Sequence, residues 1–156
     1  EVTTEGGLDI VSQEARLKDA VARLADVGII VSVFIDAEIA QVEAAARIGA
    51  GVCEVHTGPY AHAFHAAGRD AESPAVLAEI AKLARAGEAI RALGLRFNAG
   101  HALNYYNVQP IARLPGIREL HIGHSIVSRS VFTGLREAVK EMKRLMREAA
   151  DRGLKA

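Results

Sequence analysis

The chain has 156 residues, half of which are hydrophobic, and its 19 basic and 19 acidic residues give a formal net charge of zero. This is about the size of one domain with enough apolar residues for a core, and the balanced charge argues against a nucleic-acid-binding surface or a polybasic membrane anchor. No apolar run approaches the roughly 20 residues that a membrane-spanning helix needs. The single cysteine, Cys53, allows no disulfide within the chain. This favours a reducing cytoplasm, and the thiol is expected to be a small buried hydrophobe.

The first third of the chain alternates between helix-forming and strand-forming segments. Residues 1–12 are rich in Gly and Thr and predict a loop, and apolar residues at helical spacing predict a helix at about 13–27. A β-branched, apolar strand is expected at 29–35, then a helix at about 38–48 and a strand at 52–55. Along the whole chain a glycine separates a helix from the following strand at three places, which are Gly28, Gly49 and Gly94.

The rest of the chain continues this alternation after one interruption. Residues 59–72 are polar, rich in Ala and His, and show no clear period. Ser73 and Pro74 then predict the start of a helix that runs to about Leu93, because Ser can cap free N–H groups and Pro suits the first helical position. The remaining segments are a strand at 95–99, a loop or short helix to about 114, a strand at 120–122 and a helix at about 133–150.

Four strands, each followed by a helix, fit either a doubly wound open sheet or half of an eight-stranded βα barrel, which needs about 250 residues in all. The loop and helix before the first strand indicate that another strand preceded them. We therefore expect an α/β fold, the second half of a TIM (β/α)8 barrel. Residues 1–156 would be the carboxyl-terminal part of one domain whose amino-terminal half is absent from this chain. The start at Glu1 is neither a signal peptide nor an initiator methionine, which agrees with this expectation.

Polar side chains follow the predicted strands, where the functional groups of parallel βα units gather. Glu54 and His56 lie two apart on one strand and share a face; they could move protons or stabilise a cation, or they could form a structural pair. His101 follows Asn98-Ala-Gly at a strand end and could be a general acid or base, or it could simply cap the loop. Gly123 and His124 follow the last strand, where barrels often bind phosphate through backbone N–H groups.

Other polar residues give weaker signals. His62 and His65 have a spacing that could bind a metal, but no Cys or carboxylate cluster completes a site nearby, so a solvated loop is favoured. Asp36 could be catalytic, although a role as a helix cap is favoured. The sequence does not indicate which way His121 points.

Five segments, in this order, resemble the pyridoxine 5′-phosphate synthase family. They are Glu1-Val-Thr-Thr-Glu-Gly-Gly-Leu-Asp9, Phe34-Ile-Asp36, Glu54-Val-His-Thr-Gly58, Asn98-Ala-Gly-His101 and Ile122-Gly-His124. The resemblance covers the chain apart from residues 61–74 and corresponds to the part after about strand four of the barrel. It implies a βα barrel that assembles into homo-octamers. It also implies condensation of 1-deoxy-D-xylulose 5-phosphate with 3-amino-2-oxopropyl phosphate to pyridoxine 5′-phosphate, phosphate and water, with no redox or metal cofactor.

The resemblance also implies roles for individual residues. His101 is similar to the family's late proton donor, and Glu54 resembles the carboxylate that stabilises a transition state. Thr3 matches the threonine that contacts the deoxyxylulose phosphate. The site of the aminoketone phosphate is matched by Gly123 and His124.

Ala102 stands where the family usually has a substrate-contacting glycine after the catalytic histidine. A backbone N–H contact would survive this change unless the conformation needs a positive φ. The family's other catalytic histidine and its second catalytic glutamate belong to the first half of the barrel. We therefore predict that the chain is inactive alone and that a companion polypeptide could supply the missing half.

Two other interpretations remain open at this stage. One is another phosphate-binding barrel enzyme, such as an isomerase or an aldolase, and the other is a non-catalytic half-barrel fragment. An aldolase would need a Schiff-base lysine, but the lysines fall on predicted helices or at the tail. They are Lys18, Lys82, Lys140, Lys143 and Lys155.

Overall fold

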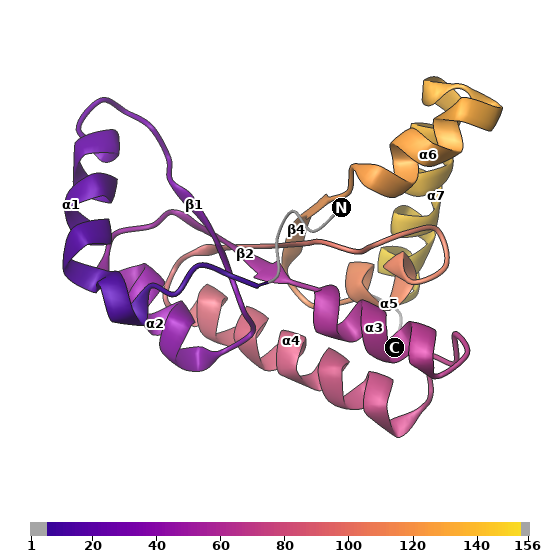
Figure 1. Ribbon diagram of the computed structural model, residues 1–156, viewed down its shortest axis with the longest axis horizontal. Helices are drawn as coiled ribbons and strands as arrows, with labels where there is room; N and C mark the ends of the chain where they lie inside the picture. Colours follow the sequence, from indigo (N-terminus) through magenta and orange to yellow (C-terminus); the bar gives the residue numbers. More distant parts are fainter. Residues whose placement is uncertain (1–5, 154–156) are drawn as a thin grey trace.

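The computed structural model describes residues 6–153, and it contains a sheet of four parallel strands (Figure 1). The strands are β1 (Ser32–Ile35), β2 (Val52–His56), β3 (Arg96–Gly100) and β4 (Ile117–His121). They pair in the order β1-β2-β3-β4, which is also their order in the chain. A doubly wound sheet reverses its strand order at a switch point, and this sheet does not. The α/β fold with four parallel strands alternating with helices is therefore confirmed, in the order that half of a barrel requires.

Helices lie along one face of the sheet and at its ends. In Figure 1, α2 and α4 lie below the sheet, α1 stands at one end, and α6 and α7 stand at the other. Among the described residues the helical segments are a 3-10 turn η1 (Val11–Gln13), α1 (Glu14–Ala25), α2 (Ile39–Arg47), α3 (Gly58–Ala66), α4 (Pro74–Ala92), α5 (Val108–Ala112), α6 (His124–Thr133) and α7 (Leu135–Gly153). No helix in this part of the chain is long and apolar enough to cross a membrane.

The start of α4 follows the predicted capping chemistry. The Val76 N–H donates to the Ser73 Oγ over 3.4 Å, and Pro74 occupies the first helical position. The N–H that proline lacks would have had no partner in the first turn of the helix. The predicted start is confirmed.

Several predictions of local structure were wrong. The strand expected at 120–122 is β4, which begins at Ile117 and ends before Ile122, because its pairing with β3 runs from Ile117 to His121. Residues 29–31 lie outside β1, because pairing with β2 begins only at Ser32, opposite Val52. Residues 58–66 form α3 instead of an irregular insertion. The helix α6 was not expected. It buries none of its side chains, so it has no inward apolar stripe for a sequence pattern to reveal.

One face of the sheet forms the hydrophobic core with the helices. Cys53, Val55 and Phe97 on this face are at most 1% exposed. Burial raises the pKa of the Cys53 thiol to about 11, which agrees with its expected role as a small hydrophobe. A Cβ atom on Gly87 of α4 would collide with the Phe97 ring, so this glycine lets α4 approach β3 closely.

The opposite face of the sheet is polar. Because side chains alternate between the two faces of a strand, every second residue of each strand points to this face. The register of the strands arranges these residues in two rows. The first row is Phe34, Glu54, Asn98 and Glu119, and the second is His56, Gly100 and His121. In a closed barrel this face would line the interior.

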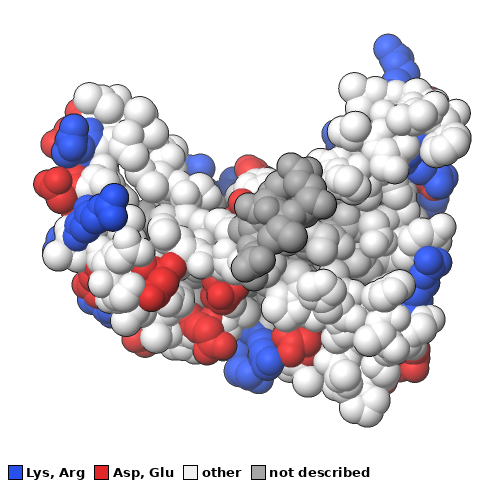
Figure 2. All heavy atoms as spheres, viewed as in Figure 1, with Lys and Arg blue, Asp and Glu red and all other residues white. Residues whose placement is uncertain are grey.

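The charged surface lies mainly on the helices. Figure 2 shows Lys, Arg, Asp and Glu side chains along the outer margins formed by α1, α4 and α7, with fewer on the surface between α1 and α6. The sheet has two outer strands, β1 and β4, each of which pairs on one side only within the described residues. An apolar groove of about 360 Å³ lies between β1 and α1.

Candidate active site

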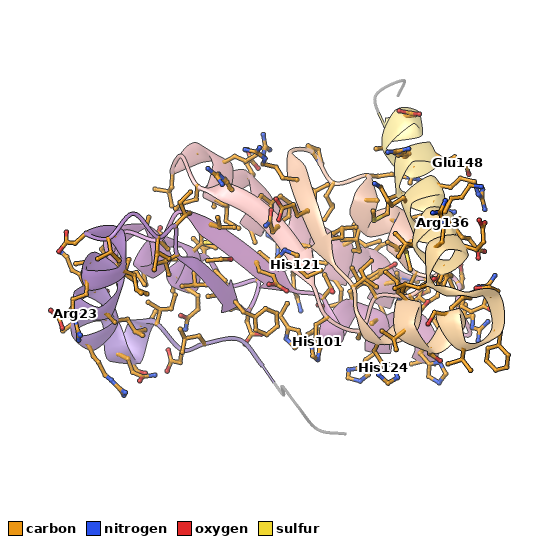
Figure 3. The ribbon with its side chains drawn as sticks, turned by 90° about the horizontal axis from the view of Figure 1, so that it is seen from above. Arg23, His101, His121, His124, Arg136 and Glu148 are labelled. Atoms are coloured by element: carbon orange, nitrogen blue, oxygen red, sulfur yellow. The ribbon has the colours of Figure 1, made fainter. Side chains whose placement is uncertain are left out.

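A cavity of about 530 Å³ opens where β2, β3 and β4 end. It is lined by Glu54 on β2, by His101 to Asn104 after β3, and by His121 to Ser125 at the end of β4 and the start of α6. Figure 3 shows His101 and His124 along one edge of the molecule and His121 farther in, over the sheet. The cavity brings together five residues singled out in the sequence, which are Glu54, His101, Ala102, Gly123 and His124. Thr3 lies outside the described residues.

Glu54 is held by a histidine from another strand. Its Oε2 lies 2.6 Å from the Nδ1 of His121, and the His121 Nε2 lies 3.5 Å from an Oε2 of Glu119. Burial lowers the pKa of His121, but the hydrogen bonds and negative charges of Glu54 and Glu119 outweigh this and raise the pKa above its usual value. When His121 is protonated, it places a positive charge against Glu54. This answers the open question of where His121 points.

A glycine between these two residues makes the pair possible. Gly100 on β3 lies between β2 and β4 in the sheet. A Cβ atom at this position would collide with the Glu54 carboxylate and would lie 3.1 Å from both the Cβ and the carbonyl oxygen of His121. The absence of a side chain on Gly100 therefore lets a β2 carboxylate reach a β4 imidazole across the intervening strand.

His101 has an unusual backbone and an aromatic environment. Its φ is +85°, and the φ of Ala102 is +57°, so two successive non-glycine residues adopt the left-handed region. The His101 ring centroid lies 5.1 Å from that of His56 and 5.9 Å from that of Phe34. The exception attached to Ala102 therefore applies, since the backbone has a positive φ at this position. Ala102 itself adopts that φ, so a backbone N–H contact is retained, at the energetic cost that a Cβ atom brings.

His56 faces the same side of the sheet as Glu54, as predicted, but it has a different partner. Its Nδ1 lies 3.0 Å from the Oδ1 of Asp36, which also accepts the Gly7 N–H at 3.1 Å. The favoured role of Asp36 as a helix cap was wrong. Glu38 is the residue that precedes α2, and Asp36 lies two residues earlier, where its carboxylate points to β2.

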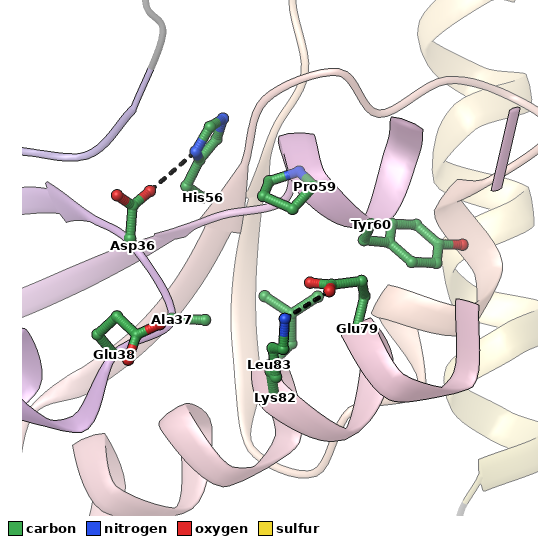
Figure 4. A pocket seen from close by; sticks show the side chains of 9 residues that line it. All are labelled: Asp36, Ala37, Glu38, His56, Pro59, Tyr60, Glu79, Lys82 and Leu83. Carbon is green, nitrogen blue, oxygen red and sulfur yellow. Dashed lines mark hydrogen bonds and ion pairs between the residues drawn. The ribbon is translucent and has the colours of Figure 1, made fainter. Parts of the chain in front are cut away.

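The Asp36–His56 pair borders a second cavity of about 310 Å³ (Figure 4). On its other side the Lys82 Nζ lies 2.6 Å from the Glu79 Oε1, both on α4. Like Lys82, three further lysines lie on helices, as predicted, and Lys155 lies outside the described residues. The three are Lys18, Lys140 and Lys143.

The far end of the main cavity is the start of α6. Gly123 precedes the helix and His124 is its first residue, and no side chain caps the first turn. The N–H groups of such a turn lack intrahelical acceptors and carry the positive end of the helix dipole. This end of the cavity therefore favours an anionic group such as a phosphate.

His62 and His65 do not form part of this cavity. They lie on α3 and are exposed, at the rim of a smaller hollow of about 220 Å³ that also contains Arg69 and Tyr106. The two histidines are solvated, as predicted, but the prediction that they lie in a loop was wrong. Among the residues that the structure describes, no three His, Cys, Asp or Glu side chains gather closely enough to hold a metal ion.

Several residues with a place in or around this cavity were not singled out in the sequence. The sequence did not indicate the direction of the His121 side chain. Three further residues bind the backbone of the 101–103 loop, and they are Thr57, Asn107 and Ser125. Thr57 stands inside a segment that carried the family resemblance, so that segment was the available signal. Asn107 and Ser125 had none, because their roles depend on contacts across the fold.

Comparison with known proteins identifies the family. The family model of the pyridoxal phosphate biosynthesis protein PdxJ matches residues 1–148. The chain belongs to the PdxJ family. The resemblance seen in the sequence is therefore confirmed.

Close relatives carry the name pyridoxine 5′-phosphate synthase. The one from Azoarcus sp. (strain BH72) is 85% identical over 150 residues, which are 96% of this chain and 60% of the relative. The one from Aromatoleum aromaticum is 82% identical over 153 residues, or 98% of this chain and 61% of the relative. The one from Magnetococcus marinus is 54% identical over 149 residues, which are 96% of this chain and 58% of the relative. The chain thus spans about 60% of the length of these relatives.

Proposed function

We propose that this chain supplies the carboxyl-terminal part of the active site of a pyridoxine 5′-phosphate synthase. The reaction would condense 1-deoxy-D-xylulose 5-phosphate with 3-amino-2-oxopropyl phosphate, by acid–base catalysis and without a redox or metal cofactor. The observation that carries the proposal is one cavity that joins a carboxylate, an imidazole and an uncapped helix start, contributed by Glu54, His101 and Gly123. Membership of the PdxJ family supports it.

Each end of the cavity suits a different part of this chemistry. His101 would donate a proton late in the reaction, since imidazole can exchange protons near neutral pH. The Glu54 carboxylate, fixed by His121, would stabilise positive charge that develops on the condensing substrates. The aminoketone phosphate would bind at Gly123 and His124, with a backbone N–H of Ala102 beside it.

Further features of the proposal concern residues and polypeptide segments outside the described structure. Thr3 would contact the deoxyxylulose phosphate. Because the chain spans about 60% of its relatives, we propose that the amino-terminal half of the same barrel domain is needed for activity, either on a longer chain or on a companion polypeptide. Assembly into a homo-octamer and a cytoplasmic location belong to the same proposal and rest on the family resemblance and on the single unpaired cysteine.

A fusion enzyme tests the proposal. It joins the amino-terminal part of the Azoarcus relative that this chain does not match to the complete chain, a design made reasonable by their 85% identity. With both phosphorylated substrates we expect pyridoxine 5′-phosphate and free phosphate from the fusion enzyme and none from the chain alone. His101→Ala should lower turnover by about 10²-fold or more, whereas His62→Ala, an exposed histidine on α3, should leave it unchanged.

The outcomes separate the alternatives. Product from the chain alone would contradict the proposed need for the first half. An unaffected His101→Ala variant would remove this histidine from the mechanism. A fusion enzyme that folds but stays inactive would favour a non-catalytic half-barrel or a different phosphate-binding barrel enzyme.

A further inference from the structure

Side chains from three separate parts of the chain hold three successive carbonyl groups beside the cavity. The Thr57 hydroxyl, at the end of β2, donates to the His101 carbonyl oxygen over 2.5 Å. The Asn107 Nδ2, just before α5, donates to the Ala102 carbonyl oxygen over 3.1 Å. The Ser125 hydroxyl in α6 donates to the carbonyl oxygen of the next residue, Leu103, over 2.9 Å. The loop that carries His101 is therefore fixed through its backbone.

Thr57 is the most buried of these contacts and the one that acts on His101 itself. It is fully buried. Its hydroxyl also lies 2.6 Å from the Gly100 carbonyl oxygen, but that oxygen already accepts the backbone N–H of Thr57 over 2.8 Å. A hydroxyl has one proton to donate, and among the described residues the His101 carbonyl oxygen has no other donor. We therefore assign the Thr57 hydroxyl proton to the His101 carbonyl oxygen, since the Gly100 carbonyl oxygen already has a donor.

This contact controls the direction of the peptide group that follows His101. His101 and Ala102 both have positive φ, a conformation that costs energy for residues with a Cβ atom and persists only where the surroundings impose it. In a planar trans peptide the C=O and N–H bonds point in opposite directions. Because the carbonyl points to the buried Thr57, the Ala102 N–H points away from Thr57, and Ala102 itself lines the cavity.

We propose that Thr57 is a positioning residue of this site. Its hydroxyl holds the His101 carbonyl so that His101 and Ala102 keep their left-handed backbone and present the imidazole and the Ala102 N–H to the cavity. Thr57 does not line the cavity, so it acts through the loop and has no contact with a substrate. The kinetic consequence rests on the proposed synthase function, whereas the backbone consequence does not.

Substitutions that separate the hydroxyl from the bulk of the side chain test this role in the fusion enzyme. Thr57→Val keeps the shape and removes the hydroxyl, and we expect turnover to fall by about tenfold or more, with a smaller change in KM. Thr57→Ser keeps the hydroxyl and should retain most of the turnover. If the Thr57 side chain only filled space, Thr57→Ser would lose more turnover than Thr57→Val. Thr133→Val is the matched control, because the Thr133 hydroxyl is exposed and, among the described residues, bonds only to carbonyl oxygens at its own helix end.

The backbone is measured separately in the 156-residue chain. Three-bond NMR couplings across the N–Cα bonds of His101 and Ala102 distinguish positive from negative φ. We expect positive φ in the wild type, in Thr57→Ser and in Thr133→Val, and loss of positive φ at one or both residues in Thr57→Val. If Thr57→Val does not fold, Thr57→Ser and Thr57→Ala provide the comparison, because these two variants differ by one oxygen atom.

Two results would overturn the inference. One is unchanged couplings together with unchanged turnover when the hydroxyl is removed. The other is equal loss in Thr57→Ser and Thr57→Ala, which would assign the effect to the γ-methyl group. A wild-type fusion enzyme without activity would contradict the proposed function, and the couplings would still decide whether Thr57 fixes the loop.

Discussion

Replacing Ala102 with glycine should stabilise the chain. Ala102 is exposed and has a φ of +57°, and the left-handed region costs an L-residue about 1–2 kcal/mol. Glycine avoids this cost but loses about 0.5–1 kcal/mol more conformational free energy on folding. Because the methyl group is exposed, its removal leaves no cavity. The difference predicts that Ala102→Gly raises the free energy of unfolding by about 0.5–1 kcal/mol, or the melting temperature by about 1–4 °C.

Urea unfolding and thermal unfolding measure this effect, and a second substitution gives the control. Ala22 is exposed in the last turn of the right-handed helix α1, where the same change to glycine should lower the free energy of unfolding by about 0.5–1 kcal/mol. The two substitutions have the same chemistry and opposite expected signs. A loss of stability in Ala102→Gly as large as that in Ala22→Gly would refute the reasoning, since residue 102 would then not have a left-handed backbone in solution.

Three further predictions concern the cavity and the helix start. Gly100→Ala should lower the free energy of unfolding by about 1–3 kcal/mol, because the added Cβ would collide with the Glu54 carboxylate, which is bound to His121, and would crowd the His121 backbone carbonyl; an unchanged urea midpoint would contradict this close packing. His121→Asn tests the pair with Glu54. Since the pKa of His121 is raised in the fold from 6.5, its stabilisation is complete below that value and is lost as the pH rises through the raised pKa. The wild type should therefore exceed His121→Asn in stability by more at about pH 6 than at about pH 9, and equal differences would argue against the pair. Ser73→Ala should cost about 0.5–1 kcal/mol in unfolding free energy, because the Val76 N–H loses its side-chain acceptor over a long 3.4 Å contact; a loss below the error of urea unfolding would show that Ser73 does not cap α4.

Local patterns in the sequence determined the alternation of helices and strands. Gly28, Gly49 and Gly94 follow three helices, and all three have positive φ, a conformation that glycine adopts without the cost of a Cβ atom. The apolar runs after them became β1, β2 and β3, because short segments rich in β-branched and apolar residues pack well against the helices that cover one face of the sheet. These features depend on neighbours in the sequence, so they can be recognised without a structure.

The sequence also indicated where the candidate site would lie, although not how its residues are connected. Glu54 lies on β2, and His101 and His124 follow β3 and β4. These strands end at the same edge of a parallel sheet, which is why the three residues surround one cavity. Their individual roles came from the family resemblance and remain proposals. The helix α6 was missed because its exposed apolar side chains give no one-sided pattern.

Tertiary structure alone decided which side chains meet. The pairing of Glu54 with His121 depends on a register across three strands, which includes an irregularity between Phe97 and Asn98, and on the missing side chain of Gly100 between them. The contacts of Asp36 with His56 and of Thr57 with the His101 carbonyl likewise join residues 20 and 44 positions apart. Hydrogen bonds of this kind require atoms within about 3 Å, and only the packing of the strands and helices brings them that close.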